Sequence, residues 1–261
     1  MNKLKIILED IVVYPIKSLP GIKVNHSILK PGGGLQWDRQ WRLIDANGKT
    51  INGKRDPRVH LVKASYDLDS LNVRLAIKDE SPAEFSLRYQ LKEMGDWFAA
   101  KWDEEIKCVF TNDHFSDDQK ASGPTIAGIA SLDLVRKWFG WSTLEEAYCR
   151  FRPNLIISGT EPFAEDRLLM CPKREILVGG QLLHANNICK RCVVPSRNPF
   201  TGDHTNNFAK IFIENRKRDT PKNVPLKELD HFYRFAINTR VLALTDSGII
   251  KKGDSVQCFT G

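Results

Sequence analysis

The chain has 261 residues, of which 41% are hydrophobic and 27% are charged, so it can bury one sizeable core or two small ones. This composition excludes a disordered tail, and no run approaches the roughly 20 apolar residues of a membrane-spanning helix. The net charge of +7 is dispersed along the chain, so a nucleic-acid partner is not indicated. Six Cys without an evident secretory signal predict reduced thiols and a cytoplasmic location.

The first hundred residues are predicted to be mostly β. The segments 60–66 and 71–77 are short, partly alternating and rich in β-branched residues, which indicates a hairpin with its turn at 67–70. A second reversal is predicted within 41–51, because Asn47-Gly48 suits the positive φ angles of a tight turn.

Helices are predicted mainly in the second half. Ser131 is expected to cap a helix at 131–139 that ends before Gly140, and the capping pattern at Ser142 and Thr143 predicts a short helix at 143–149. The other predicted elements are a helix at 207–215, a loop at 217–225, and strands at 154–158, 176–178, 181–185, 235–244 and 255–259.

These elements predict a fold that is mainly β with a few helices (α+β). Strands and helices do not alternate regularly along the chain, so a β-barrel is a more economical architecture than a parallel α/β sheet. The polar segment 111–123 is the expected junction between two domains, 1–112 and 113–261.

The Cys189-x-x-Cys192 pair is the sharpest local signal for chemistry. A thioredoxin-like pair would place its second Cys in a helix, which Pro195 and Pro199 oppose. Two buried structural thiols are the simplest alternative.

A metal site is the other interpretation of this Cys pair. Zinc could recruit His184 and His204, but their spacing matches no common zinc pattern. Lys190 and Arg191 lie between the two thiols, and neighbouring cations favour the thiolate form. The sequence therefore favours a soft-metal ligand or a nucleophile here.

Basic residues with small polar neighbours recur at three predicted strand ends. They lie in the segments Tyr14-Pro15-Ile16-Lys17-Ser18, Trp37-Asp38-Arg39-Gln40-Trp41 and Phe151-Arg152-Pro153-Asn154. Each segment alone is compatible with a solvated surface charge. Together they could bind an anion such as a phosphate, since Arg binds phosphate through two hydrogen bonds and Lys as a point charge.

These motifs occur in the order typical of one known family. With Ala130-Ser131-Leu132, Ser158-Gly159, Glu165-Asp166 and the segments 189–202 and 247–254, they make the chain resemble the MOSC family over about residues 8–257. The resemblance implies a MOSC N-terminal β-barrel-like domain at 1–112 and a MOSC β-barrel domain at 113–261. The chain is similar to members that include the mitochondrial amidoxime-reducing component and bacterial proteins that reduce N-hydroxylated bases.

The resemblance also implies one cofactor site for a molybdenum-pterin cofactor. Its metal ligand and catalytic residue is Cys192. The residues implied to bind the cofactor are Lys17, Ser18 and Arg39 around the phosphate, Arg152 and Asn154 along the pocket, Arg191 flanking the cofactor, and Ser131 and Asn198 as further members.

The chain departs from the family pattern near this site. Asn198 stands where Asp is common, Lys190 where a small residue is frequent, Ile129 where a polar or acidic residue is usual, and Ala236 where Gly is expected. These departures predict that the substrate preference can differ from that of other members.

The implied activity is an oxidoreductase that reduces small N-hydroxylated compounds, such as amidoximes and N-hydroxypurines. The electrons would come from a separate flavin or iron-sulfur protein. One alternative is a sulfur carrier or sulfurtransferase in which Cys192 bears a persulfide, with any pyridoxal-phosphate dependence supplied in trans. Another alternative is a carrier of the cofactor that is not an enzyme.

Overall fold

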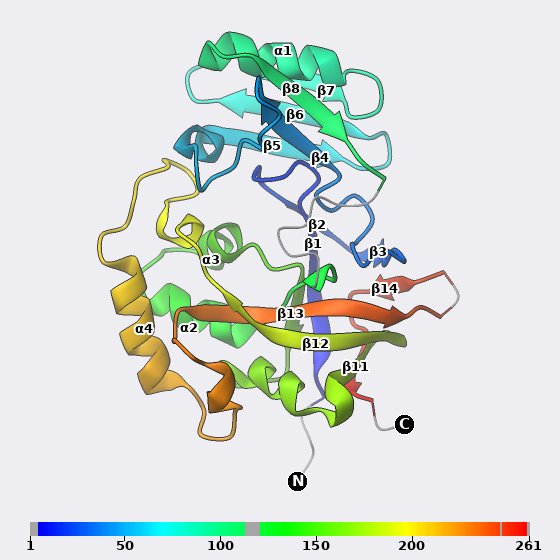
Figure 1. Cartoon of the computed structure of the whole chain (residues 1–261), viewed down its shortest axis with the longest axis vertical. Coiled ribbons are helices and arrows are strands. Elements are labelled where there is room, and N and C mark those ends of the chain that lie inside the picture. The colour runs from blue at the N-terminus through cyan, green and yellow to red at the C-terminus, as the bar shows by residue number, and fades with distance from the viewer. Residues whose placement is uncertain (1–4, 113–120, 246, 260–261) are drawn as a thin grey trace.

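A computed structural model describes residues 5–112, 121–245 and 247–259 of the chain. Its element order confirms the predicted class, mainly β with a few helices. Figure 1 shows an upper part that holds β4 to β8 with α1, and a lower part built around a large sheet. None of the helices in the described ranges is long and apolar enough to cross a membrane.

The upper part consists of short antiparallel strands. β4 (Trp41–Asp45) pairs with β8 (Ile106–Phe110), while β5 (Val62–Asp67), β6 (Asn72–Ile77) and β7 (Ala83–Ser86) form a three-stranded sheet. The β5–β6 pairing confirms the predicted hairpin. The reversal at Asn47-Gly48 is also confirmed, because Gly48 has a φ of +71° and its N–H donates to the Asp45 carbonyl at 2.9 Å.

Helix α1 (Leu91–Trp102) was not predicted from the sequence. Its N-cap residue, Gln90, makes no side-chain capping bond, and Gly95 lowers the helix propensity of its centre. Gly95 nevertheless suits its place, because a Cβ there would lie 3.0 Å from the Ile106 carbonyl oxygen of β8. Close packing of the helix on β8 therefore overrides the local preference.

The lower part contains a mixed eight-stranded sheet in the order β15-β11-β12-β13-β9-β10-β1-β2. Its strands are β1 (Ile7–Val13), β2 (Ile22–Val24), β9 (Ile126–Gly128), β10 (Leu155–Ser158), β11 (Glu175–Val178), β12 (Gln181–Lys190), β13 (Arg234–Ala243) and β15 (Val256–Cys258). β9 and β10 run parallel and the other pairs are antiparallel. The pairings among the described strands do not close this sheet into a barrel.

Two short strands, β3 (His26–Ile28) and β14 (Ile249–Lys251), form a separate antiparallel pair. The predicted junction falls largely on residues 113–120, which lie outside the described residues. The division at 112/113 therefore stays a prediction.

Three helices lie on one side of the lower part (Figure 1). They are α2 (Ile129–Trp138), α3 (Leu144–Phe151) and α4 (Phe208–Asp219), and an aromatic cluster packs between them and the sheet. In this cluster the rings of Phe151 and Phe235 lie 4.4 Å apart between centroids. The helix predicted at 143–149 is confirmed with its cap, since the Glu146 N–H donates to the Thr143 hydroxyl.

Two helix boundaries differ from the prediction. α2 begins at Ile129 with Gly128 as its N-cap, so the predicted capping role of Ser131 is wrong. α4 continues to Asp219, because Phe208, Phe212 and Arg216 bury one face of it, so the loop begins three residues later than predicted.

The prediction that all six Cys are reduced is wrong for two of them. Cys171 and Cys258 form a disulfide, with their Cα atoms 5.3 Å apart and a sequence separation of 87. The pairing of β11 with β15 places Ile176 opposite Cys258 and so brings the two Cys together. Such long-range strand pairing leaves no signal in the local spacing of the Cys residues.

Five 3-10 helices link the main elements in the described ranges: η1 (Pro57–Leu61), η3 (Ala164–Met170), η4 (Pro172–Arg174), η5 (Val194–Ser196) and η6 (Leu226–Glu228).

The Glu165-Asp166 motif lies in a buried network rather than at the surface. In η3, Asp166 forms an ion pair with Arg216 of α4, and both side chains are almost fully buried. The Arg216 guanidinium also lies 3.5 Å from the centroid of the Phe163 ring.

Asp166→Ala is expected to lower the free energy of unfolding by about 3 to 5 kcal/mol, because it leaves the buried Arg216 charge without its partner. Urea unfolding measures this loss. Asp96→Ala is the matched control, since Asp96 and Lys92 form an exposed pair for which about 0.5 kcal/mol or less is expected. Similar losses in both variants would contradict a special role for the buried pair.

Ala236 is a strained position in β13. Its backbone φ is +69°, which is unusual for a residue other than Gly. Ala236 is buried, with 2% of its surface exposed, and lies where the register between β12 and β13 shifts. A left-handed conformation costs an L-residue about 1 to 2 kcal/mol, whereas Gly adopts it freely. Ala236→Gly is therefore expected to raise the free energy of unfolding by about 1 kcal/mol. A decrease in the free energy of unfolding, measured with urea, would contradict the explanation that Ala at position 236 is strained.

Candidate functional site

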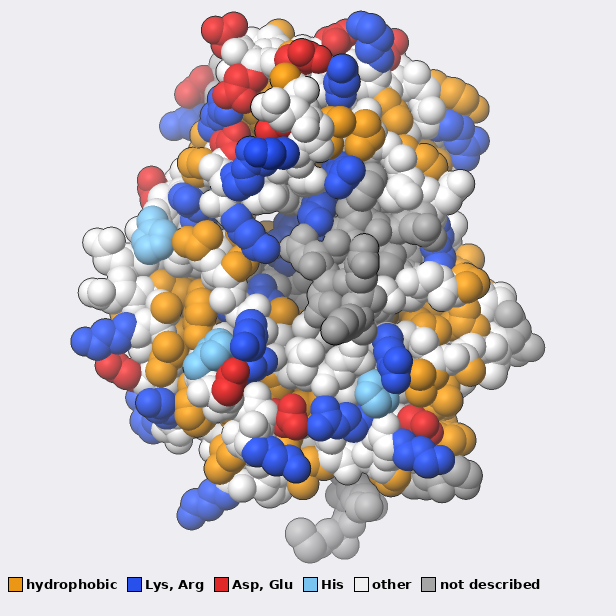
Figure 2. Space-filling model, in the orientation of Figure 1, with side chains coloured by type: hydrophobic (Ala, Val, Ile, Leu, Met, Phe, Trp, Pro, Cys, Tyr) orange, Lys and Arg blue, Asp and Glu red, His pale blue; other side chains and the backbone are white. Residues whose placement is uncertain are grey.

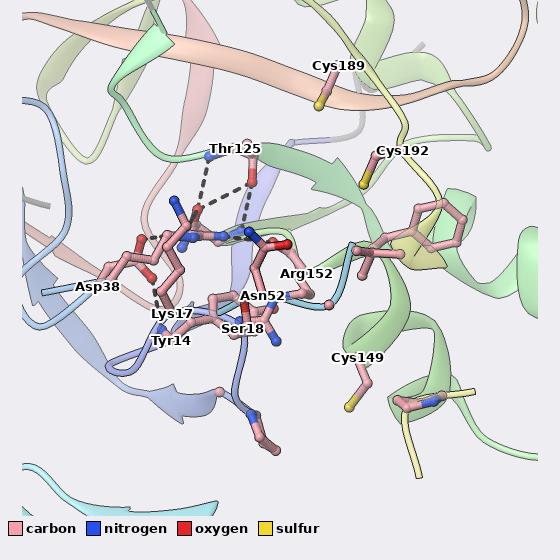
Figure 3. Close-up of a pocket in the computed structure, with 18 of the residues that line it drawn as sticks. Tyr14, Lys17, Ser18, Asp38, Asn52, Thr125, Cys149, Arg152, Cys189 and Cys192 are labelled. Carbon is pink, nitrogen blue, oxygen red and sulfur yellow. Dashed lines mark hydrogen bonds and ion pairs between the residues drawn. The ribbon is translucent and has the colours of Figure 1, made fainter. Parts of the chain in front are cut away.

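One cavity of about 870 Å³ brings most of the predicted site residues together. Seven of them line it: Lys17, Ser18, Arg39, Arg152, Asn154, Arg191 and Cys192. Figure 3 shows the labelled members of this set gathered around the cavity. They come from segments that are far apart in sequence, so the tertiary fold assembles the site.

The segment after β1 forms one wall of the cavity. The Tyr14 N–H donates to Asp38 Oδ1 at 2.8 Å, and the Tyr14 hydroxyl donates to the Pro153 carbonyl at 3.0 Å. The Lys17 N–H donates to the Trp41 carbonyl at 2.7 Å. These bonds hold three basic segments against one another, which sequence reasoning could not show.

A polar network fixes Arg39 and Asn154. Arg39 forms an ion pair with Asp38, and its Nη1 donates to Asn154 Oδ1 at 3.3 Å. The Asn154 amide nitrogen donates to the Val12 carbonyl at 3.0 Å, and its Oδ1 also accepts from the Thr125 N–H. The Asn154 side chain thus ties Arg39 to β1.

Three cavity residues adopt left-handed backbone conformations. The φ angles are 75° for Ser18, 52° for Arg39 and 51° for Arg152. Arg152 is the C-cap of α3, and its N–H donates to the Tyr148 carbonyl at 2.8 Å. Non-Gly residues with positive φ cost free energy and cluster at functional sites, so this grouping marks the cavity as a candidate site.

Arg152 is a half-buried cation without an anionic partner among the described residues. Its guanidinium lies 4.1 Å from the Tyr14 ring centroid, and its buried Nη2 atom has no hydrogen-bond partner in the described part of the chain. Burial, and then the nearby Arg39, lowers the pKa of Arg152 from its usual value. Among the described residues that line the cavity, Asp38 pairs with Arg39 and Glu145 with Lys23, so neither carboxylate forms an ion pair with Arg152.

The two Cys of the motif have different surroundings. Cys189 lies in β12, and the Arg191 guanidinium contacts its sulfur at 3.4 Å. Cys192 follows the strand, and its carbonyl accepts from the Tyr233 hydroxyl at 2.9 Å. The chain then enters η5 and not an α-helix, which does not fit a thioredoxin-like pair.

The zinc alternative lacks a ligand set. Within the described ranges, no group of three or more His, Cys, Asp or Glu side chains could hold a metal ion. His184 pairs with Arg240 across β12 and β13, and His204 bridges to Arg197, so strand pairings and not a metal account for their positions.

Two predicted residues do not line the cavity. Ser131 is fully buried, donates to Glu165 Oε2 and accepts from the Phe163 N–H, so its hydroxyl is already used within the core. Asn198 Oδ1 accepts from the N–H groups of Phe200 and Thr201 and so closes a turn. Neither residue is part of the candidate site.

Two further cavity residues, Cys149 and His60, were missed from the sequence. Burial raises the pKa of the Cys149 thiol to about 11, so it stays protonated at neutral pH. Burial, followed by the charge of Arg152, lowers the pKa of His60 to about 4, so the imidazole is neutral. Neither residue lies in a motif, and only the tertiary structure places them at the cavity.

The sequence matches two known domain families. Residues 5–139 match the model of the MOSC N-terminal beta barrel domain, and residues 113–257 match that of the MOSC domain. The chain belongs to the MOSC family. The barrel named by the first model is represented here by open, short-stranded sheets among the described residues.

The chain is similar to proteins of two kinds. The chain is 25% identical to the mouse mitochondrial amidoxime-reducing component 1 and 24% identical to the human one, over 94% of this chain and 79% and 80% of theirs. It is also 25% identical to the molybdenum cofactor sulfurase of rice, over 71% of this chain but only 27% of that protein. These MOSC relatives link the family to the molybdenum cofactor and leave the substrate open.

Proposed function

We propose that this protein is a molybdenum-pterin-dependent oxidoreductase that reduces small N-hydroxylated compounds. The observation that carries the proposal is the Arg152 guanidinium, whose buried Nη2 atom has no hydrogen-bond partner among the described residues, in the cavity that also contains the Cys192 thiol. The Arg152 guanidinium is suited to bind a phosphate, and the Cys192 thiol is suited to bind a soft metal. The molybdenum-pterin cofactor offers both.

Different residues of the chain would bind different parts of this cofactor. Arg152, Arg39, Lys17 and Ser18 would bind the phosphate, while Asn154 orients Arg39. Cys192 would be the metal ligand and the catalytic residue. When bound, the cofactor supplies the two-electron chemistry that reduces the N–O bond.

Arg191 would fix the loop that carries Cys192. Its Nη2 donates to the Phe151 carbonyl at 2.9 Å, and its N–H donates to the Tyr233 carbonyl at 3.1 Å. These bonds tie the loop to α3 and to the segment before β13. The thiol is therefore held at a defined place in the cavity wall, as a metal ligand requires.

The proposed reaction consumes two electrons and two protons for each N–O bond, and releases the N–H product and one water. We propose a separate flavin or iron-sulfur protein as the electron donor. The cavity would lie at the junction of an N-terminal domain, 1–112, and a MOSC domain, 113–261.

The test is turnover of a simple amidoxime with a chemical electron donor. Protein from a host that makes the molybdenum cofactor should convert benzamidoxime to benzamidine, and protein from a host that lacks the cofactor should not. Equal rates in the two preparations would contradict the proposal.

A sulfur-carrier function is the second candidate, since the sulfurase relatives match 71% of this chain. In that case Cys192 would bear a persulfide after reaction with a sulfane-sulfur donor. Mass spectrometry of the protein treated with such a donor would show a gain of one sulfur on Cys192 and none on Cys192→Ser.

A further inference from the structure

We propose that Asn187 and Asn238 determine the substrate specificity of the cavity by hydrogen bonding to an amino group beside the N–O bond. The site therefore prefers amidoximes and related compounds, which carry an amino group on the carbon of the C=N–OH unit, to oximes, which lack it. This inference rests on the function proposed above and assigns substrate-binding residues to the same site.

The two amides face each other across neighbouring strands, β12 and β13 (Figure 1). Asn187 lies opposite Asn238, and the Asn238 amide nitrogen donates to Asn187 Oδ1 at 3.1 Å. Both residues are half-buried and line the cavity. Their strand neighbours, Ile188 and Ile237, are 0% exposed and belong to the core. Because successive side chains of a strand point to opposite faces, the amide pair lies on the cavity face of the sheet.

The backbone around the pair is irregular. The register between β12 and β13 shifts immediately before Asn187 and again within 188–190. On β13, Ala236 adopts its left-handed conformation two residues before Asn238. Irregularities of this kind redirect side chains and are over-represented next to active sites. They support a functional role for the two amides.

The hydrogen bond between the two amides uses only part of their capacity. A carboxamide offers two N–H donors and an oxygen that can accept two bonds. The bond between Asn238 and Asn187 takes up one N–H and one lone pair, so each amide can still donate and accept. In an amidoxime the amino group can donate to an amide oxygen while the oxime nitrogen accepts from an amide N–H. An oxime offers no such donor.

The pair lies on a wall that the phosphate of the cofactor does not need. The residues proposed to bind the phosphate lie after β1, before β4 and at the C-terminus of α3, and none of them lies on β12 or β13. Cys189, two residues after Asn187, also lines the cavity, and Cys192 follows on the same segment. The strand that carries the amide pair therefore leads to the proposed metal ligand, and we assign this wall to the substrate.

The charged residues of the cavity are suited to other partners. Lys and Arg side chains gather between the upper and lower parts of the molecule (Figure 2). Arg39 pairs with Asp38, and Lys190 and Arg234 pair with Asp230. An amidoxime is uncharged at pH 7, and a neutral amide binds it without the cost of desolvating a charge. The amide pair therefore suits an uncharged substrate better than these side chains do.

Binding of two matched ligands to the cofactor-loaded protein tests the inference. Benzamidoxime and acetophenone oxime share a phenyl ring and a C=N–OH group, and differ by an amino group in place of a methyl group. Calorimetry without an electron donor measures their binding without turnover. We expect benzamidoxime to bind at least about tenfold more tightly, because its amino group gains hydrogen bonds. Without such bonds the better-hydrated amino group would favour the oxime, so equal binding, or tighter binding of the oxime, would overturn the proposal.

Asn238→Leu removes one amide at nearly constant side-chain size. It should weaken benzamidoxime binding about tenfold and change the binding of acetophenone oxime by less than about twofold, so the preference is lost. Asn72→Leu is the matched control and should keep the preference, since Asn72 is a half-buried strand residue outside the cavity lining. Loss of the preference in both variants, or in neither, would overturn the proposal.

Asn187→Leu is a second test that does not depend on the folding of Asn238→Leu. It should also abolish the preference. Because the two amides act as a pair, the double variant should lose no more of the preference than either single variant. Additive losses would contradict recognition by the pair as one unit.

Molybdenum and pterin content, measured on the same samples, separates this inference from the proposed function. Loss of pterin from Asn238→Leu with an unchanged ligand preference would show that the pair binds the cofactor, and would overturn the inference. Parent protein that carries molybdenum and pterin but lacks the preference would overturn only the inference. Parent protein with neither would overturn the proposed function, and the ranking of the two ligands would then decide the inference by itself.

Discussion

Cys192→Ser is expected to give a folded protein that retains no molybdenum and does not reduce benzamidoxime. The change replaces a soft sulfur ligand with a hard hydroxyl that stays protonated at neutral pH, and such a group is a poor ligand for the metal. Metal analysis and turnover measure the two losses separately. Folding should persist, because Cys192 is only half-buried and does not belong to the hydrophobic core clusters.

Cys189→Ser is the matched control for this experiment. Cys189 lies three residues away and also lines the cavity, but its sulfur contacts the Arg191 guanidinium. We expect full metal content and a change of less than about 1 kcal/mol in the free energy of unfolding. Equal loss of activity in both variants, with metal retained in Cys192→Ser, would instead indicate a disulfide or persulfide mechanism that uses the pair.

Arg152→Met is expected to lower the pterin content by at least tenfold while leaving the protein as stable as the parent, or more stable. Met keeps an unbranched apolar side chain against the Tyr14 ring but removes the charge. A charge-assisted contact to a buried phosphate contributes about 2 to 5 kcal/mol to binding. Removing a charge that has no anionic partner among the described residues also relieves the desolvation cost of its buried Nη2 atom.

Arg152→Met is expected to lower the pterin content without lowering the stability of the protein. This combination distinguishes a role in cofactor binding from a role in folding. Pterin content is measured by fluorescence after oxidation, and stability by urea unfolding. Arg55→Met is the control, because Arg55 is half-exposed, pairs with Asp45 and does not line the cavity. A strongly destabilised Arg152→Met protein with normal pterin content would show that the guanidinium serves the fold and not the cofactor.

Elements with local signals were predictable from the sequence. The β5–β6 hairpin has alternating residues on both sides of a polar turn, and α3 has a Thr143 cap three residues before Glu146. Helix α1 and the Cys171–Cys258 disulfide had no such signals. The first depends on close packing of Gly95 against β8 and the second on the pairing of β11 with β15.

Most individual residues of the candidate site were predictable from the sequence, but their convergence on one cavity was not. The Cys motif and the basic segments stand out by residue type, but their convergence depends on long-range contacts such as the bond from Tyr14 to Asp38. No sequence motif marks His60 or Cys149, which only the tertiary fold brings to the cavity. It also could not show that the Ser131 hydroxyl is used inside the core, by Glu165 and Phe163.

Molybdenum and pterin content of the purified protein tests the central claim most directly. Protein made in a host that synthesises the molybdenum cofactor should carry close to one molybdenum and one pterin per chain, measured by elemental analysis and by fluorescence of the oxidised pterin. Protein from a deficient host should fold and carry neither, because the three hydrophobic clusters do not depend on a metal. Stoichiometric zinc without pterin in the first preparation would contradict the account.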